Sequence, residues 1–324
     1  MRLAALCVVL SLFAAPAGAQ VTPWRHGVVE AKSDAGIVFM PGEHDFAEKQ
    51  GLKLQFMQFK GDAIAIKAFL AGDLDSYEGN PGAAMLAAAH GADVRLVGCY
   101  WPGMTYGLFA REGINGFADL SGRNVAISSP GSLPDLVVRA MLRQHDMAPA
   151  TVRFAVLGSD TDRFRALSQG LVQAAAFSTE FMPLLPAQHL HLLASVADEL
   201  PNYLRFCTFI SGRTLQERGP QAIGFLAAEM QGWAYALAHT DEAVALSHRL
   251  TGAKADDPRA AALLAQVAQH HSVDPTAPVP MEKLAWIQNL LVQTKNLSAP
   301  SDLSHLVETD TRIKALARAG IGGS

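Results

Sequence analysis

Strand-like and helix-like segments alternate along the first two thirds of the chain, and this alternation is the strongest constraint on its fold. Apolar segments at Leu52–Phe59, Leu74–Tyr77 and Val94–Tyr100 have the length and composition of strands. Helical patterns between them begin near Asp62 and Asn80. Strands joined by helical crossovers pair in parallel. The pattern therefore predicts an α/β lobe with a mostly parallel sheet.

Local capping signals place the helices of this first lobe. A helix of about 14 residues is predicted from near Asp34. Asp62 is predicted to cap the next helix, which Gly72 ends. Asn80 is a predicted N-cap, because Pro81 follows it at the first helical position.

The alternation restarts after Tyr106 and continues to about residue 210, which predicts a second α/β lobe. From Gln216 onward the periodicity is almost entirely helical. We therefore expect lobe one to begin with residues 20–106 and lobe two to consist of residues 107–208. Residues 209–324 are expected to complete lobe one and to add the C-terminal helices.

The first twenty residues have the pattern of a secretory signal peptide. Arg2 is followed by an apolar run, Leu3–Ala15, that is too short to span a bilayer comfortably. Ala17-Gly18-Ala19 then gives a small-residue cleavage site. We expect residues 1–19 to be removed by cleavage after Ala19, and the mature chain to be periplasmic.

Cleavage at that position leaves two cysteines, Cys99 and Cys207. An exported compartment permits a disulfide between them. Two buried, reduced thiols are the alternative. The sequence leaves both possibilities open.

Charge and motifs exclude several function classes. The formal net charge is −4 and no dense Lys/Arg cluster occurs, which argues against nucleic-acid binding. Phosphate-loop, nucleophile-elbow, dinucleotide-binding and zinc-binding sequence motifs are absent. His189 and His191 share one face of a predicted strand, but no further ligands accompany them. We therefore predict no catalytic residues, no cofactor and no metal site.

Polar turns at residues 32–34, 78–82, 128–135 and 178–180 lie where predicted strands lead into helices. In open parallel sheets, ligands bind beyond the carboxyl ends of strands, where helix N-termini point at the crevice. Two turns belong to each lobe, which predicts a binding site in the cleft between the lobes. The predicted ligand-binding residues are Ser33, Asp34, Asn80, Trp101, Ser129, Ser132, Ser178 and Glu180.

Each of these residues has a structural alternative. Any one turn can be an ordinary helix cap, and Ser132 with Asp135 has the spacing of a capping box. Trp101 either stacks on a planar ligand or packs at the junction of the lobes. Arg205 either pairs with an anionic ligand or forms a salt bridge between the lobes. Asp160 and Arg163 are expected to form a local ion pair at a helix start.

Several of these segments resemble the periplasmic substrate-binding proteins of ABC importers, in the group that includes the sulfonate, taurine, nitrate and thiamine-pyrimidine receptors. The similar segments cover roughly residues 25 to 210. They are Glu48–Leu52, Ala68–Asp75, Ala88–Val94, Ala118–Ala126, Ser129–Ser132 and Ala166–Ala174. The chain departs from the group at Gln173, where an Asp is frequent.

The resemblance implies a type II periplasmic-binding-protein fold with a helical C-terminal part packed on lobe one. It implies two strands that cross between the lobes, near Thr105–Ala110 and Phe206–Ser211. It also implies closure of the lobes on a ligand by hinge motion.

By this resemblance the chain is a soluble receptor that binds a small organic ligand and delivers it to an ABC permease in the inner membrane. We expect an anionic ligand, because serines occupy two predicted helix starts, and a monomeric protein. One alternative is an enzyme of the same fold, similar to the fungal pyrimidine-precursor synthases, whose cysteine-rich iron-binding segment this sequence lacks. Another is a periplasmic sensor that presents its ligand to a membrane kinase.

Overall fold

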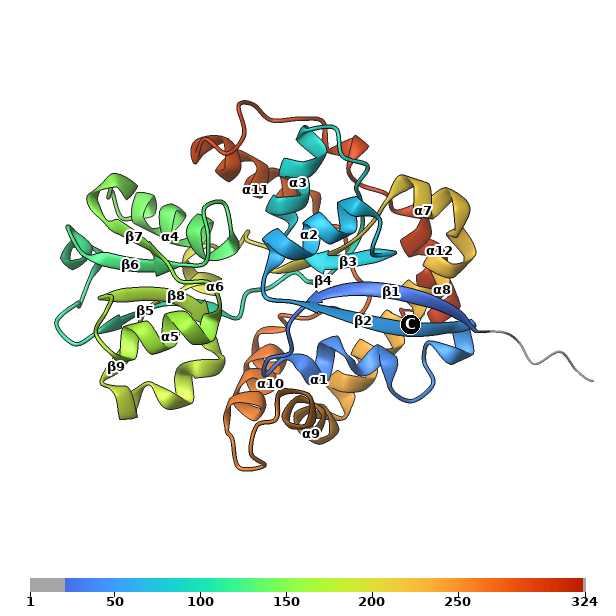
Figure 1. The fold of residues 1–324 in the computed structure, drawn as a ribbon, viewed down its shortest axis with the longest axis horizontal. Helices are drawn as coiled ribbons and strands as arrows, with labels where there is room; N and C mark the ends of the chain where they lie inside the picture. Colours follow the sequence, from blue (N-terminus) through green and yellow to red (C-terminus); the bar gives the residue numbers. More distant parts are fainter. Residues whose placement is uncertain (1–20, 323–324) are drawn as a thin grey trace, which may run out of the picture.

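The computed structural model describes residues 21–322, which form two α/β lobes, each built on a five-stranded sheet (Figure 1). The predicted signal peptide, residues 1–19, lies outside the described residues. The two-lobed fold predicted from the sequence is confirmed. No helix among residues 21–322 is both long and apolar enough to span a bilayer.

The sheet of lobe one has the strand order β2-β1-β3-β10-β4. Strand β1 is parallel to β2 and β3, whereas β10 is antiparallel to β3 and β4. The strands are β1 (Thr22–Val29), β2 (Leu52–Phe59), β3 (Ser76–Gly79), β4 (Arg95–Trp101) and β10 (Phe206–Ile210).

The sheet of lobe two has the order β7-β6-β8-β5-β9. Strand β6 is parallel to β7 and β8, whereas β5 is antiparallel to β8 and β9. The strands are β5 (Tyr106–Arg111), β6 (Asn124–Ile127), β7 (Arg153–Val156), β8 (Ala174–Ser178) and β9 (Leu190–Ser195).

Both sheets are thus mixed, which corrects the prediction of mostly parallel sheets. Strands β5 and β10 are the strands by which the chain enters each lobe from the other. Each begins beside the opposite lobe and runs away from it, so its direction is opposite to that of its neighbours. The crossings therefore lie just before the predicted ranges, in residues 102–105 and 200–205.

The helices that flank the sheet of lobe one within the first hundred residues are α1 (Ala35–Val38), α2 (Asp62–Ala71) and α3 (Pro81–Ala89). Asn80 caps α3 as predicted, with its side chain accepting a hydrogen bond from Gly82 N at 2.8 Å. Asp62 is not a cap, since Gly61 occupies that position. The Asp62 carboxylate instead accepts hydrogen bonds from Tyr77 Oη and Asn80 N.

The predicted helix of about 14 residues after Asp34 is wrong. Helix α1 has four residues and is followed by a 3₁₀ turn, Met40–Gly42. Pro41 explains the early end, because proline lacks the N–H that a continuing helix requires and restricts the residue before it.

Lobe two carries α4 (Leu133–Gln144), α5 (Asp160–Ser168), α6 (Val196–Glu199) and the 3₁₀ helix η5 (Thr179–Leu184). The C-terminal part of the chain forms α7 (Gly212–Glu217), α8 (Gly219–Ala238), α9 (Thr240–Thr251), α10 (Arg259–His270), α11 (Met281–Gln293) and α12 (Asp310–Ala319).

The C-terminal helices pack on lobe one as predicted, and two of them also contact lobe two. Helix α8 packs against β1, β2 and α12, and its face buries Phe225, Met230 and Trp233. Helix α10 contacts η5, and α11 contacts both α3 and α4 (Figure 1). The C-terminal part therefore completes lobe one and borders the space between the lobes.

A disulfide joins Cys99 in β4 to Cys207 in β10. These strands are antiparallel neighbours, which brings together two residues that are 108 positions apart. The structure thus decides between the two possibilities that the sequence left open. The bond lies in lobe one, close to both crossings.

Replacing both cysteines, Cys99→Ser with Cys207→Ser, should lower the free energy of unfolding by about 2–5 kcal/mol, because the disulfide closes a long loop in the unfolded chain. Urea unfolding followed by circular dichroism measures the difference. Dithiothreitol should destabilise the wild type by a similar amount and leave the double variant unchanged. Two free thiols per mature wild-type chain under denaturing conditions would contradict the disulfide.

Candidate ligand-binding cleft

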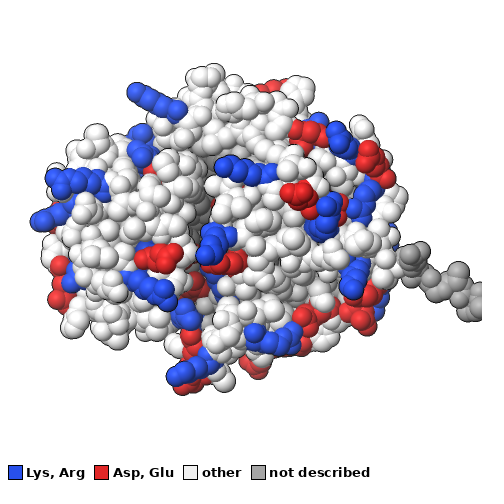
Figure 2. Space-filling model, in the orientation of Figure 1, with Lys and Arg blue, Asp and Glu red and all other residues white. Residues whose placement is uncertain are grey.

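A cleft of about 570 Å³ lies between the lobes, at the carboxyl ends of β1 and β2. Its lobe-one side comes from residues 29–33 and 60–64, and its lobe-two side from residues 128–134 and 158–165. Helices α9 and α10 close one end with side chains that include Ser247, His248 and Arg259. Figure 2 shows this face of the molecule hollowed between the lobes, with Lys or Arg side chains at its rim.

Two polar contacts join the lobes at the floor of the cleft. Lys32 Nζ of lobe one pairs with Asp160 Oδ2 of lobe two at 2.8 Å. The backbone N–H of Ser33 donates to Glu180 Oε2 at 2.9 Å. Asp160 and Glu180 are both buried, so each contact replaces solvation that closure removes.

Asp160 is the centre of a charged network, because it also pairs with Arg163 and accepts a hydrogen bond from Tyr106 Oη. Burial alone would raise the pKa of Asp160, but the charges of Lys32 and Arg163 outweigh burial and hold this pKa well below its usual range. Asp160 is therefore ionised at neutral pH. The predicted Asp160–Arg163 ion pair is present, and Lys32 adds the link to lobe one.

Burial raises the pKa of Glu180, and the charge of Lys32 only partly opposes that effect. The pKa of Lys32 is itself raised, because the charges of Asp160 and Asp34 outweigh the opposing effect of burial. The lysine therefore keeps its charge at the floor of the cleft.

Arg205 organises the segments that cross between the lobes. Its guanidinium pairs with Asp34 and donates to Thr105 Oγ1 at 2.8 Å. The same group lies over the ring of Trp101, 4.2 Å from its centroid. Arg205 thus holds both crossings together by the salt bridge that was one of its two alternatives, and it also lines the cleft.

Four of the eight predicted site residues line the cleft and four do not. Those that line it are Ser33, Ser129, Ser132 and Glu180. Asp34 is buried in its ion pair with Arg205, and Asn80 caps α3 and donates to Tyr203 Oη at 3.3 Å. Ser178 is buried and accepts from Glu180 N at 3.4 Å, so it positions a residue of the cleft instead of lining it.

The placement of Trp101 corrects the prediction of an aromatic wall. Its side chain is fully buried and packs edge-on against Trp233 and Phe206. Trp101 ends β4 in the interior of lobe one, where the Arg205 guanidinium lies over its ring. Phe206 and Tyr106 line the cleft and supply its aromatic surface.

The turn before α4 is arranged differently from a capping box. Ser132 Oγ donates to Ser129 O at 2.6 Å and caps no helix amide. Asp135 accepts from Gly131 N at 2.8 Å and pairs with Arg139. The first turn of α4 therefore has no side-chain cap where it borders the cleft, and it carries the Asp135 carboxylate.

Sequence reasoning missed several side chains of the cleft. Lys60 and Arg165 are exposed cations that form no ion pair with any described residue. Lys60 directly follows β2, so the same strand-end rule that selected Ser33 would have found it. Ser247, His248 and Arg259 come from distant C-terminal helices, and no local signal marks them.

A second polar cluster lies inside lobe one, between the sheet and α8, and consists of His26, Glu78 and Glu229. Burial lowers the pKa of His26 to about 3 and raises that of Glu78 to about 8. Burial also raises the pKa of Glu229 far above its usual value. The sequence predicted no metal site, whereas these three groups could hold a metal ion.

Comparisons with known proteins agree with this architecture. A family model described as "NMT1/THI5 like" matches residues 33–243. No curated protein sequence matches the chain. Among solved structures, the periplasmic aliphatic sulphonate binding protein SsuA from Escherichia coli is similar, with a TM-score of 0.73, 21% identity, and coverage of 90% of this chain and 99% of that one.

Two further solved structures share the fold. The alkanesulfonate-binding protein SsuA from Xanthomonas axonopodis pv. citri, bound to MOPS, has a TM-score of 0.74 and 17% identity and covers 89% of this chain and 98% of its own. The desulfurization enzyme DSZB has a TM-score of 0.67 and 15% identity, with coverage of 92% and 99%. Binding proteins and an enzyme are therefore both among the structures similar to this chain.

Asp160→Asn should lower the free energy of unfolding at pH 7 by about 3 kcal/mol or more, because the buried Arg163 and the partly buried Lys32 lose their partner. The matched control is Asp162→Asn, which removes an exposed carboxylate from the same helical turn and should cost about 1 kcal/mol or less. Urea unfolding monitored by circular dichroism measures both values.

The pH dependence of the Asp160→Asn deficit follows from the lowered pKa of Asp160. A carboxylate whose pKa is lower in the folded state than in the unfolded state stabilises the protein fully at any pH above its unfolded-state pKa. This stabilisation is lost as the pH falls through the folded-state pKa. The deficit should therefore be constant from neutral pH to about pH 4 and shrink below it. Equal deficits for both variants at pH 7 would contradict the role of Asp160.

Proposed function

The chain belongs to the NMT1/THI5-like family, and from that premise we propose that it is the periplasmic substrate-binding component of an ABC importer. The observation that carries the proposal is a cleft of about 570 Å³ lined by both lobes, with cross-lobe contacts at its floor. This volume is in the range that binds small organic molecules. The similar proteins from E. coli and Xanthomonas are described as sulfonate-binding, which supports the same kind of role here.

The cargo that we propose is a small organic anion with an apolar portion. Lys60 and Arg165 offer unpaired positive charge, and no side chain caps the start of α4 at the cleft. Ile64, which is 56% exposed, gives the cleft an apolar surface. An alkanesulfonate or a comparable carboxylate combines these two properties.

Binding would work by a shift between open and closed arrangements of the lobes. A ligand that contacts both lobes stabilises the closed form, and the permease recognises that form. The Lys32–Asp160 pair contributes to closure even without cargo, so the ligand has to supply only the remaining stabilisation. Export to the periplasm by the predicted signal peptide and action as a monomer are parts of this proposal.

An enzyme of this fold is the competing function. Both cysteines among residues 21–322 are in the disulfide, so a free thiol nucleophile is absent from the described part of the chain. A sensor for a membrane kinase would use the same closed form as a transport receptor. Adjacent genes for a permease and an ATPase would favour import.

A thermal-shift screen of sulfonates, carboxylates and pyrimidines is expected to raise the melting temperature with at least one anionic class, because bound ligand stabilises the folded state. Native mass spectrometry of protein isolated from its own periplasm identifies cargo retained during purification. New products formed from the stabilising compound would instead support an enzyme.

Arg165→Ala and Ser132→Ala should each weaken binding of that compound by about tenfold or more, which is about 1.4 kcal/mol. Isothermal titration calorimetry measures the affinity. Arg123→Ala removes an exposed arginine of lobe two that does not line the cleft, and it should bind like the wild type. Unchanged affinity in both cleft variants would show that the ligand binds elsewhere.

A further inference from the structure

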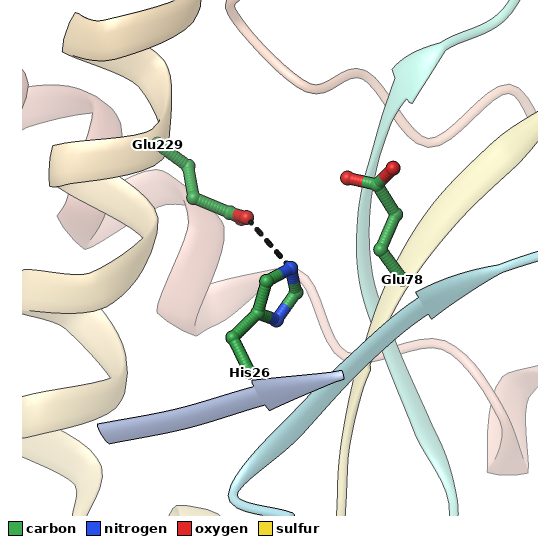
Figure 3. Close-up of side chains that lie close together, drawn as sticks. All are labelled: His26, Glu78 and Glu229. Atoms are coloured by element: carbon green, nitrogen blue, oxygen red, sulfur yellow. Dashed lines mark ion pairs between the residues drawn. The ribbon is translucent and has the colours of Figure 1, made fainter. Parts of the chain in front are cut away.

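Three titratable side chains from three separate elements meet in the interior of lobe one. His26 comes from β1, Glu78 from β3 and Glu229 from α8, and their side chains converge in Figure 3. One nitrogen or oxygen atom of each lies within 4.8 Å of the others. Their exposed fractions are 0%, 4% and 1%, respectively.

Four buried polar atoms of this cluster form no hydrogen bond within the described chain, although His26 Nε2 lies 3.3 Å from Glu229 Oε1. His26 Nε2, Glu78 Oε2 and Glu229 Oε2 are buried and form no hydrogen bond to any described residue. Thr208 Oγ1 is also buried and forms no hydrogen bond to any described residue. Thr208 lies opposite Glu78 in the antiparallel pair of β10 and β3. Neither carboxylate contacts a Lys or Arg of residues 21–322. Buried polar atoms are normally satisfied, so this group of four indicates a missing partner.

We propose that His26, Glu78 and Glu229 bind one divalent metal ion of the zinc class, with Thr208 Oγ1 able to contribute a fourth oxygen. Two carboxylates balance the charge of a divalent cation, so the buried unit becomes neutral. One imidazole with oxygen ligands in a small site favours zinc over calcium or magnesium, which require six or more oxygens.

One distance between two of the ligand atoms already matches that of a tetrahedral site. His26 Nε2 lies 3.3 Å from Glu229 Oε1. Ligand atoms bonded to a tetrahedral zinc ion at about 2.1 Å are about 3.4 Å apart. The Glu78 carboxylate lies within 4.8 Å of the other two ligand atoms, so it has to move closer to complete the site.

Ser76 contacts the imidazole on the side away from the two glutamates, and a metal ion on Nε2 would place the imidazole proton on Nδ1. Trp24 Nε1, which can only donate, donates to Ser76 Oγ at 2.8 Å. His26 Nδ1 lies 2.7 Å from the same oxygen, whose second lone pair can accept from it. A proton on Nδ1 leaves the lone pair of Nε2 directed at the two glutamates, as metal-binding histidines require.

The site is separate from the cleft but adjoins it. Glu78 also lines a small cavity of about 10 Å³, to which Lys32 and Phe206 contribute. Both of these residues line the cleft as well. The bound ion would be enclosed by protein and would connect two strands to α8, so its role is to stabilise lobe one. Such ions are acquired during folding.

The test uses the mature chain, with its disulfide intact, unfolded in urea with EDTA and refolded with or without one equivalent of ZnCl₂. After gel filtration, elemental mass spectrometry should find about one zinc ion per chain in the wild type. The zinc-refolded protein should also melt at a higher temperature than the protein refolded without metal. Wild-type protein that retains no zinc and shows no thermal shift would overturn the proposal.

Variants then locate the ion. Glu229→Gln keeps the side-chain size but removes a ligand charge, and it should lower zinc affinity by about 100-fold or more. Ser76→Ala, which removes the oxygen that contacts both His26 Nδ1 and Trp24 Nε1 but removes no metal ligand, should lower affinity by about 10- to 100-fold. The matched control is Glu242→Gln, because Glu242 faces His44 in an exposed His–Glu pair. This control should bind zinc like the wild type.

If Glu229→Gln does not fold, the zinc affinity of Ser76→Ala alone tests whether the ion binds at His26. Wild-type zinc affinity in both Glu229→Gln and Ser76→Ala would show that the ion binds surface histidines, and would overturn the proposal.

Discussion

The pairing of buried charge across the cleft is the interaction on which the arrangement of the two lobes depends. Asp160 brings a carboxylate from lobe two into the interior, where Arg163 and Lys32 both neutralise it. An ionised carboxylate without such partners would be costly at this depth. Lys32 belongs to lobe one, so its ion pair with Asp160 forms only when the lobes are together. Electrostatics at the cleft floor thus couples closure to stability.

The same requirement shapes the crossings between the lobes. Arg205 is buried beside Trp101, and its charge is met by Asp34 of lobe one. Cys99 lies two residues before Trp101, and Cys207 lies two residues after Arg205. The disulfide joins these two cysteines. The lobe-one side of the hinge is therefore cross-linked and densely packed. Motion between the lobes is left to residues 102–105 and 200–205, a division that suits a protein that closes on a ligand as two rigid bodies.

The sheet of lobe one contributes residues to two polar sites, the buried His26–Glu78–Glu229 cluster and the cleft. Strand β1 carries His26 in its interior and leads to Lys32 at the cleft, and β3 carries Glu78 directly before the turn at Asn80. Whatever fixes His26 against α8 also fixes β1, whose carboxyl end lines the cleft. A structural ion at the deeper position would thereby stiffen the binding surface without contacting the cargo.

Local patterns in the sequence determined the two α/β lobes, the cap at Asn80 and the presence of Ser33, Ser129 and Glu180 at the cleft. These features follow from strand periodicity, helix capping and the rule that sites form at the carboxyl ends of strands, all of which act over a few residues. Tertiary structure alone decided the antiparallel direction of β5 and β10, the burial of Trp101 and the disulfide. It also decided which C-terminal helices reach the cleft and the meeting of His26, Glu78 and Glu229. These outcomes join residues that are far apart along the chain, and the packing of whole elements against one another, which no local pattern specifies, brings them together.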